Sequence, residues 1–223
     1  MPVTCLLMER ICLEGLHLGA LESRRTRKQL IILAVLWRVS CHGLLRPIES
    51  LILRKRDLPF VDMPSEGRIA LLALRAPKTR HVPGAGRAQF VTIRDTATAA
   101  WLEYVTLDLA SEELLWPWTR AKHYELFKRL LKASKLDKTG ITPASGRAGG
   151  ATHYYLSGMS FETLSFLGRW TVLSSLRSYI QESGAKLVWV SLATDRQKEV
   201  SVAVSHYREV VAGPPPVPCT EWA

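Results

Sequence analysis

Six residues spread along the sequence are of types that together can act on a phosphate group. Arginine can fork onto two phosphate oxygens, lysine can donate a proton, tryptophan can donate its indole N–H, and tyrosine carries a nucleophilic hydroxyl. In chain order the six are Arg46, Glu49, Lys78, Arg147, Trp170 and Tyr179. Each residue alone has an ordinary explanation as a surface, loop or core side chain, so the interpretation depends on their order and spacing.

These residues lie in short segments with characteristic spacing. The segments read HGLLRPIE at 42–49, APKTR at 76–80, RAGGAT at 147–152 and LGRW at 167–170. Trp170 follows Arg147 by 23 residues, and Tyr179 follows Trp170 by nine. Taken in order, over about 24–182, the set resembles the catalytic domain of the tyrosine recombinases, the family of phage integrases and Cre-like site-specific recombinases. The family pattern R-x-x-x-A-T is matched directly, and G-L-R-x-x-E is matched when one additional leucine is allowed.

The resemblance implies site-specific breaking and rejoining of DNA, as in recombination or integration, through a 3′-phosphotyrosine intermediate. Tyr179 would attack the phosphorus, while Arg46 and Arg147 would bind the non-bridging oxygens of the same phosphate. Lys78 would protonate the departing 5′ oxygen as a general acid. Trp170 would donate its indole N–H to the phosphate and pack behind the site.

The resemblance also implies supporting features and partners. Glu49 would orient Arg46, from which it is one helical turn away. The reaction would need no cofactor and no metal ion. Its partner would be double-stranded DNA, on which family members assemble as homo-oligomers. Residues 195–211 could be passed to a neighbouring protomer or could pack onto their own core, and the sequence favours neither arrangement.

One position departs from the family pattern. Three residues before the second arginine the family commonly has histidine, and this chain has Ala144. His153 would lie about 240° around the helix from Arg147, a poor position for a substitute, so we interpret it as a packing residue. Because a general acid–base group typically contributes about 10²–10⁴-fold to a rate, we expect a slow or degenerate enzyme.

Two other functions remain open from the sequence. A catalytically impaired DNA-binding remnant of a mobile-element recombinase could keep the fold and lose turnover with the histidine. A topoisomerase-like relaxing enzyme would use the same set of residues. Three further arginines, Arg80, Arg169 and Arg177, are interpreted as contacts to the DNA backbone or as surface residues, with the surface favoured.

The elements that must position these residues are mostly helical. Two apolar runs, 69–74 and 89–93, predict a β-hairpin whose basic loop would hold Lys78. The paired Gly149 and Gly150 indicate close packing of the backbone there. We therefore expect a mostly helical α+β fold with a small β-hairpin or sheet. The predicted helices cover about 24–40, a segment from Pro47, 96–109 with Asp95 as its cap, 120–135, a segment opened by Pro143 and Ser145, 160–167, 172–182 and 194–211.

The composition is that of a basic protein with enough apolar material for a core. The 223 residues include 30 Lys and Arg against 20 Asp and Glu, which gives a formal charge of +10, and 47% of the residues are hydrophobic. Such a charge favours a polyanionic partner. We expect an N-terminal extension over 1–23, one catalytic domain over 24–212 and a proline-rich tail over 213–223.

Several other classes of protein find no support in the sequence. The most apolar run, 30–37, is far shorter than the ~20 residues of a membrane-spanning helix, and the first twenty residues lack the basic start of a secretory signal. The four cysteines form neither a disulfide framework nor a zinc motif. No glycine-rich phosphate loop, HExxH or GxSxG motif is present. We expect an intracellular protein that lacks the separate helical DNA-clamping domain of many recombinases.

Overall fold

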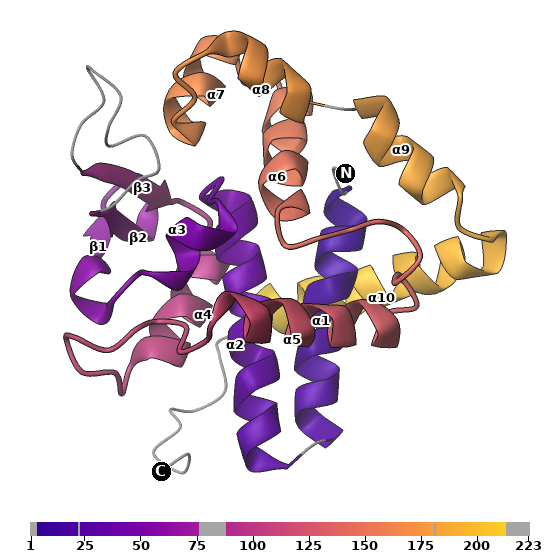
Figure 1. Ribbon diagram of the computed structural model, residues 1–223, viewed down its shortest axis with the longest axis horizontal. Coiled ribbons are helices and arrows are strands. Elements are labelled where there is room, and N and C mark those ends of the chain that lie inside the picture. The colour runs from indigo at the N-terminus through magenta and orange to yellow at the C-terminus, as the bar shows by residue number, and fades with distance from the viewer. Residues whose placement is uncertain (1–3, 22, 76–87, 181, 213–223) are drawn as a thin grey trace.

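The computed structural model describes residues 4–21, 23–75, 88–180 and 182–212 (Figure 1). Helices make up most of it, and a three-stranded antiparallel sheet lies at one side. This arrangement confirms the mostly helical α+β fold that the sequence predicts. Lys78, Arg80 and the predicted tail at 213–223 lie outside the described residues.

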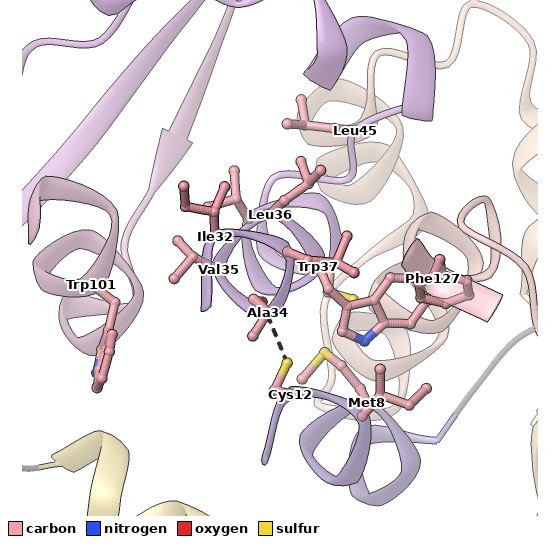
Figure 2. Close-up of a cluster of buried hydrophobic side chains, with 14 of the residues drawn as sticks. Met8, Cys12, Ile32, Ala34, Val35, Leu36, Trp37, Leu45, Trp101 and Phe127 are labelled. Carbon is pink, nitrogen blue, oxygen red and sulfur yellow. Dashed lines mark hydrogen bonds between the residues drawn. The ribbon is translucent and has the colours of Figure 1, made fainter. Parts of the chain in front are cut away.

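The centre of the molecule is the long helix α2 (Arg24–His42), which packs along α1 (Cys5–Leu21). One face of α2 presents apolar side chains at helical spacing, including Leu30, Leu33 and Trp37, and all three are buried. Met8 and Cys12 of α1 pack against this face, and Phe127 from another helix packs against Trp37 with its ring tilted by 42° (Figure 2). The first helix is therefore part of the same core as the segment that begins at residue 24.

The sheet consists of β1 (Phe60–Met63), β2 (Gly67–Leu74) and β3 (Gln89–Ile93) in that order. Leu72 pairs with Val91 in the antiparallel register of β2 and β3, which confirms the predicted hairpin. The strand β1 was not predicted, because its four residues show no alternation of buried and exposed side chains. One face of the sheet is covered by α4 (Thr96–Thr106), whose cap is Asp95 as predicted.

A close approach between α2 and α6 (Ser145–Leu156) brings Arg147, on α6, to the loop that follows α2 and precedes Arg46. A Cβ placed on Gly150 would lie 2.2 Å from the carbonyl oxygen of Cys41. No side chain fits at that distance, so the two backbones can approach only because residue 150 is glycine. This confirms the close packing that the paired glycines predict.

The remaining elements surround this centre. The short α3 (Pro47–Leu51) and a 3₁₀ turn, η1 (Lys55–Asp57), lead into the sheet, and α5 (Arg120–Ala133) precedes α6. Beyond α6 the chain forms α7 (Phe161–Gly168), α8 (Leu173–Tyr179), α9 (Glu182–Val190) and α10 (Thr194–Ala212).

The helix predicted over 172–182 is wrong in its extent. It ends at Tyr179, because Ile180 has the extended value ψ 94°, and a separate helix, α9, follows. The last helix, α10, packs against α1 of its own chain. Among the helices that the structure describes, none combines the length and the apolarity that a membrane crossing requires.

Candidate active site

Arg46 lies immediately before α3 and is held there by Glu49. The backbone N–H of Arg46 donates to Glu49 Oε2 at 2.9 Å, and its Nη1 donates to Oε1 at 2.5 Å. Proline at the first position of α3 fixes the start of this helix, so the carboxylate three residues later faces back onto the arginine. The side chain of Glu49 is only 1% exposed. Burial alone would raise its pKa, but Arg169 and Arg46 together lower the pKa below its ordinary value.

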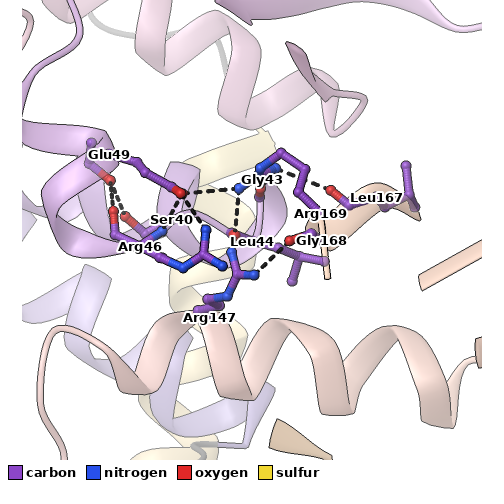
Figure 3. A network of polar contacts seen from close by, with 10 residues as sticks. Ser40, Gly43, Leu44, Arg46, Glu49, Arg147, Leu167, Gly168 and Arg169 are labelled. Carbon is purple, nitrogen blue, oxygen red and sulfur yellow. Dashed lines mark hydrogen bonds and ion pairs between the residues drawn. The ribbon is translucent and has the colours of Figure 1, made fainter. Parts of the chain in front are cut away.

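Arg147 projects from the first turns of α6 into the centre of the site. It is 2% exposed, and its guanidinium donates to the carbonyl oxygens of Leu44 and, at 2.6 Å, Gly168 (Figure 3). The carbon of the guanidinium lies 4.1 Å from the ring centroid of Trp170 and 5.6 Å from that of Tyr179. Arg147 therefore joins the loop after α2, the end of α7 and the two aromatic side chains.

Trp170 and Tyr179 form the aromatic side of the site. Their ring centroids are 5.3 Å apart at 63°, an edge-to-face arrangement. Trp170 is buried, whereas Tyr179 is partly exposed at the last residue of α8. The hydroxyl of Thr152 donates to the backbone carbonyl of Tyr179 at 3.3 Å, which ties the end of α8 to α6. The tyrosine therefore lies beside Arg147 on a supported helix end.

Arg169 is not a surface residue, contrary to the interpretation from the sequence. Its side chain is 6% exposed, and its guanidinium donates to Glu49 and to three backbone carbonyls, those of Gly43, Leu44 and Leu167. Charge alone suggested exposure, and the sequence held no signal that this arginine would turn inward. Arg177, by contrast, is exposed on α8, as the sequence favoured.

The site carries more positive than negative charge. In the described part of the chain, the guanidinium groups of Arg46 and Arg169 pair with the carboxylate of Glu49, and its charge also acts on Arg147. Burial lowers the pKa of Arg147 to about 9, and the charges of Arg46 and Arg169 act in the same direction. Within the described part of the chain, the buried Nε atoms of Arg147 and Arg169 have no hydrogen-bond partner. A buried excess of positive charge of this kind is suited to an anion with several oxygens, such as a phosphate.

Ala144 and His153 are the two positions that concern the histidine of the resembled family pattern, which this chain lacks. Ala144 is exposed at the start of α6 and offers no hydrogen-bonding side chain there. His153 is exposed near the other end of α6, so its interpretation as a packing residue is wrong. Among the residues that the structure describes, no group of three or more His, Cys, Asp or Glu side chains is placed to hold a metal ion.

Comparisons with known proteins identify the fold. No family model and no curated protein matches the chain. Among solved structures, the crystal structure of XerA recombinase matches with a TM-score of 0.58 at 14% sequence identity. The match covers 85% of this chain and 63% of the XerA chain, so this chain spans less than two thirds of that protein. The chain therefore has a fold similar to that of a recombinase.

Proposed function

We propose that this protein breaks and rejoins double-stranded DNA, with Tyr179 as the nucleophile. The observation that supports this proposal is that Arg147 lies against the rings of both Trp170 and Tyr179, with the charges of Arg46 and Arg169 close enough to lower its pKa. The similar fold of XerA recombinase and the formal charge of +10 support the same class of substrate.

The proposed reaction is an exchange of phosphate esters. The oxygen of Tyr179 forms a bond to phosphorus as the bond from phosphorus to the 5′ oxygen breaks, and the phenolic proton passes to water. The departing oxygen takes a proton from Lys78, a residue outside those that the structure describes. Arg46 and Arg147 hold the non-bridging oxygens, and their charge stabilises the transition state. Because the phosphotyrosyl ester retains the energy of the original bond, a 5′ hydroxyl can reverse the step.

A second function, DNA binding without turnover, is supported by Ala144. Nothing but a methyl group extends from this position, where the resembled family commonly has a catalytic histidine. A protein with the arginines and without that histidine can hold a phosphate and still fail to transfer it at a useful rate.

The experiment that separates these functions traps the covalent intermediate. The protein is incubated with a library of nicked duplexes of random sequence, in which cleavage beside the nick releases a short strand that diffuses away. We expect a protein–DNA adduct that survives denaturant and is lost in Tyr179→Phe. The matched control is Tyr155→Phe, because Tyr155 is an exposed tyrosine on α6 outside the site.

The outcomes are distinct. An adduct in the wild type and in Tyr155→Phe, with none in Tyr179→Phe, supports strand transfer. Retained binding of duplex DNA with no adduct supports the second function. An adduct that persists in Tyr179→Phe contradicts the assignment of the nucleophile.

A further inference from the structure

We propose that Arg169 is a positioning residue for the reaction described above, on which this inference rests. It locks the loop before Arg46 to the turn before Trp170, and so fixes both arginines that hold the phosphate. Arg169 itself is 6% exposed and faces protein groups, so it acts through its neighbours and does not contact the phosphate.

Four contacts of one guanidinium carry this proposal. Nη1 donates to Gly43 O at 3.3 Å and to Leu167 O at 3.1 Å. Nη2 donates to Leu44 O at 2.9 Å and to Glu49 Oε2 at 3.2 Å (Figure 3). One side chain thus binds the end of α7, the loop after α2 and the carboxylate of α3.

The contact with Glu49 reaches Arg46. The two oxygens of this carboxylate accept from the backbone and the side chain of Arg46, and Oε2 also accepts from Arg169. Because Glu49 is almost completely buried, its charge requires partners on both sides. Removing Arg169 leaves the carboxylate with Arg46 as its one cationic partner among the described residues, which changes the direction in which that arginine is held.

The contact with Leu44 reaches Arg147. The carbonyl oxygen of Leu44 accepts from both Arg147 and Arg169, so the two guanidinium groups share one acceptor. Leu44 has φ 49° and Arg169 has φ 60°, left-handed values that are uncommon for residues other than glycine. Such conformations persist only where the surrounding contacts hold them, and they cluster at functional sites. Here the two residues with left-handed backbone, Leu44 and Arg169, are joined directly by a hydrogen bond from the guanidinium of Arg169 to the carbonyl oxygen of Leu44.

The test compares Arg169→Lys with Arg208→Ala and Val204→Ala. Lysine keeps the charge but has a single nitrogen, which cannot reach four acceptors in different directions. Arg208 is a largely exposed arginine on α10 that pairs with Glu9, so its variant controls for the loss of a cation and an ion pair. Val204 is buried in α10, so its variant controls for the loss of stability.

We expect Arg169→Lys to slow adduct formation at saturating DNA by about 10²-fold, because small misplacements of catalytic groups have effects of this size. We expect its affinity for the same duplex, and the rates of both control variants, to remain unchanged. If Arg169 only stabilised the fold, Val204→Ala would slow adduct formation as much as Arg169→Lys does when the two variants lose the same thermal stability. An Arg169→Lys variant with the wild-type rate, or with affinity lost in proportion to rate, would overturn the proposal.

A second readout does not depend on activity, so it separates this inference from the proposed function. In spectra of protein with isotope-labelled arginine, the guanidinium signals of Arg46 and Arg147 should shift or broaden in Arg169→Lys. The signal of Arg38, a buried arginine bound to Thr98 and Asp95 elsewhere in the fold, should not change. Unchanged signals of Arg46 and Arg147 would overturn the positioning role even in a protein that forms no adduct.

Discussion

Gly168 lies directly against the ring of Trp170, and this contact leaves no space for a side chain. A Cβ built on Gly168 would meet Trp170 Cζ3 at 1.6 Å. The carbonyl oxygen of Gly168 also accepts from Arg147, so a shift of this residue moves the arginine as well as the tryptophan. At the scale of single residues, the absence of a side chain at position 168 is as important to the site as the charged groups.

This contact gives a prediction at the residue scale. We expect Gly168→Ala to reduce adduct formation by about 10²-fold or more, because Trp170 and Arg147 must both move. The measurement is the rate of the denaturant-resistant adduct at saturating DNA. Gly140→Ala is the control, because Gly140 has a left-handed φ of 71° but no atom within 4 Å of its built Cβ. Equal rates in the two variants would show that the contact between Gly168 and Trp170 is unimportant.

Residue types and intervals in the sequence suggested Arg46, Glu49, Arg147, Trp170 and Tyr179 as site residues. The structure connects them through ion pairs, a shared acceptor and ring contacts, and their catalytic roles stay predictions. Arg169 could not be selected, because its direction depends on the left-handed backbone at its own position. Propensity predicts this conformation for glycine and only rarely for arginine. The exposure of His153 could not be predicted either, since helical spacing gives its angle around the helix from Arg147 but not which elements pack against that face.

At the scale of elements, the packing of α2 against α6 brings Arg147 to the loop that follows α2 and precedes Arg46. We expect Gly150→Ala to lower the free energy of unfolding by about 1–3 kcal/mol, because its Cβ would lie 2.2 Å from the oxygen of Cys41. Urea denaturation measures the change. The sign of this change is decisive. Alanine is intrinsically a better helix former than glycine by about 1 kcal/mol, so a position with room for the Cβ would be stabilised instead.

The matched control for this prediction is Gly146→Ala in the same helix. The three atoms nearest its built Cβ belong to the side chains of Cys41 and Trp37, the closest at 3.1 Å, so a smaller loss of stability is expected. A Gly150→Ala variant as stable as the wild type would mean that the helices are farther apart than described.

Element boundaries were predictable where a specific residue sets them. Asp95 caps α4 by accepting from Thr98 N–H, and Pro47 starts α3. The strand β1 and the break between α8 and α9 were not predictable, since β1 depends on pairing with β2 and its own four residues are too few to show a pattern. Tertiary contacts, rather than local propensity, decide such short elements.

At the scale of the whole molecule, the excess of basic residues predicts how affinity for DNA depends on salt. If six to ten phosphates are contacted, the affinity should fall by about 10³–10⁵ between about 50 and 200 mM salt. Fluorescence anisotropy with a labelled duplex, repeated over a series of salt concentrations, gives the slope. An affinity that does not depend on salt would contradict an interface with the phosphate backbone.

The overall fold class followed from the sequence because helical periodicity and one pair of apolar runs are strong signals. The arrangement of the helices around α2 did not follow, because it depends on which apolar faces pack together. The first helix illustrates this difference. Its residues Leu7 and Ile11 are completely buried, although the sequence around them carried no motif that joined it to the rest of the chain.

The ion pair between Glu49 and Arg169 joins residues that are 120 positions apart. During synthesis, Arg46 and Glu49 leave the ribosome long before Arg169 and Tyr179 do. A nascent chain that stops before Arg169 leaves Glu49 without this ion pair, and one that stops before Tyr179 lacks the proposed nucleophile. Under the proposed function, only a chain complete through the end of α8 can form the covalent adduct with DNA.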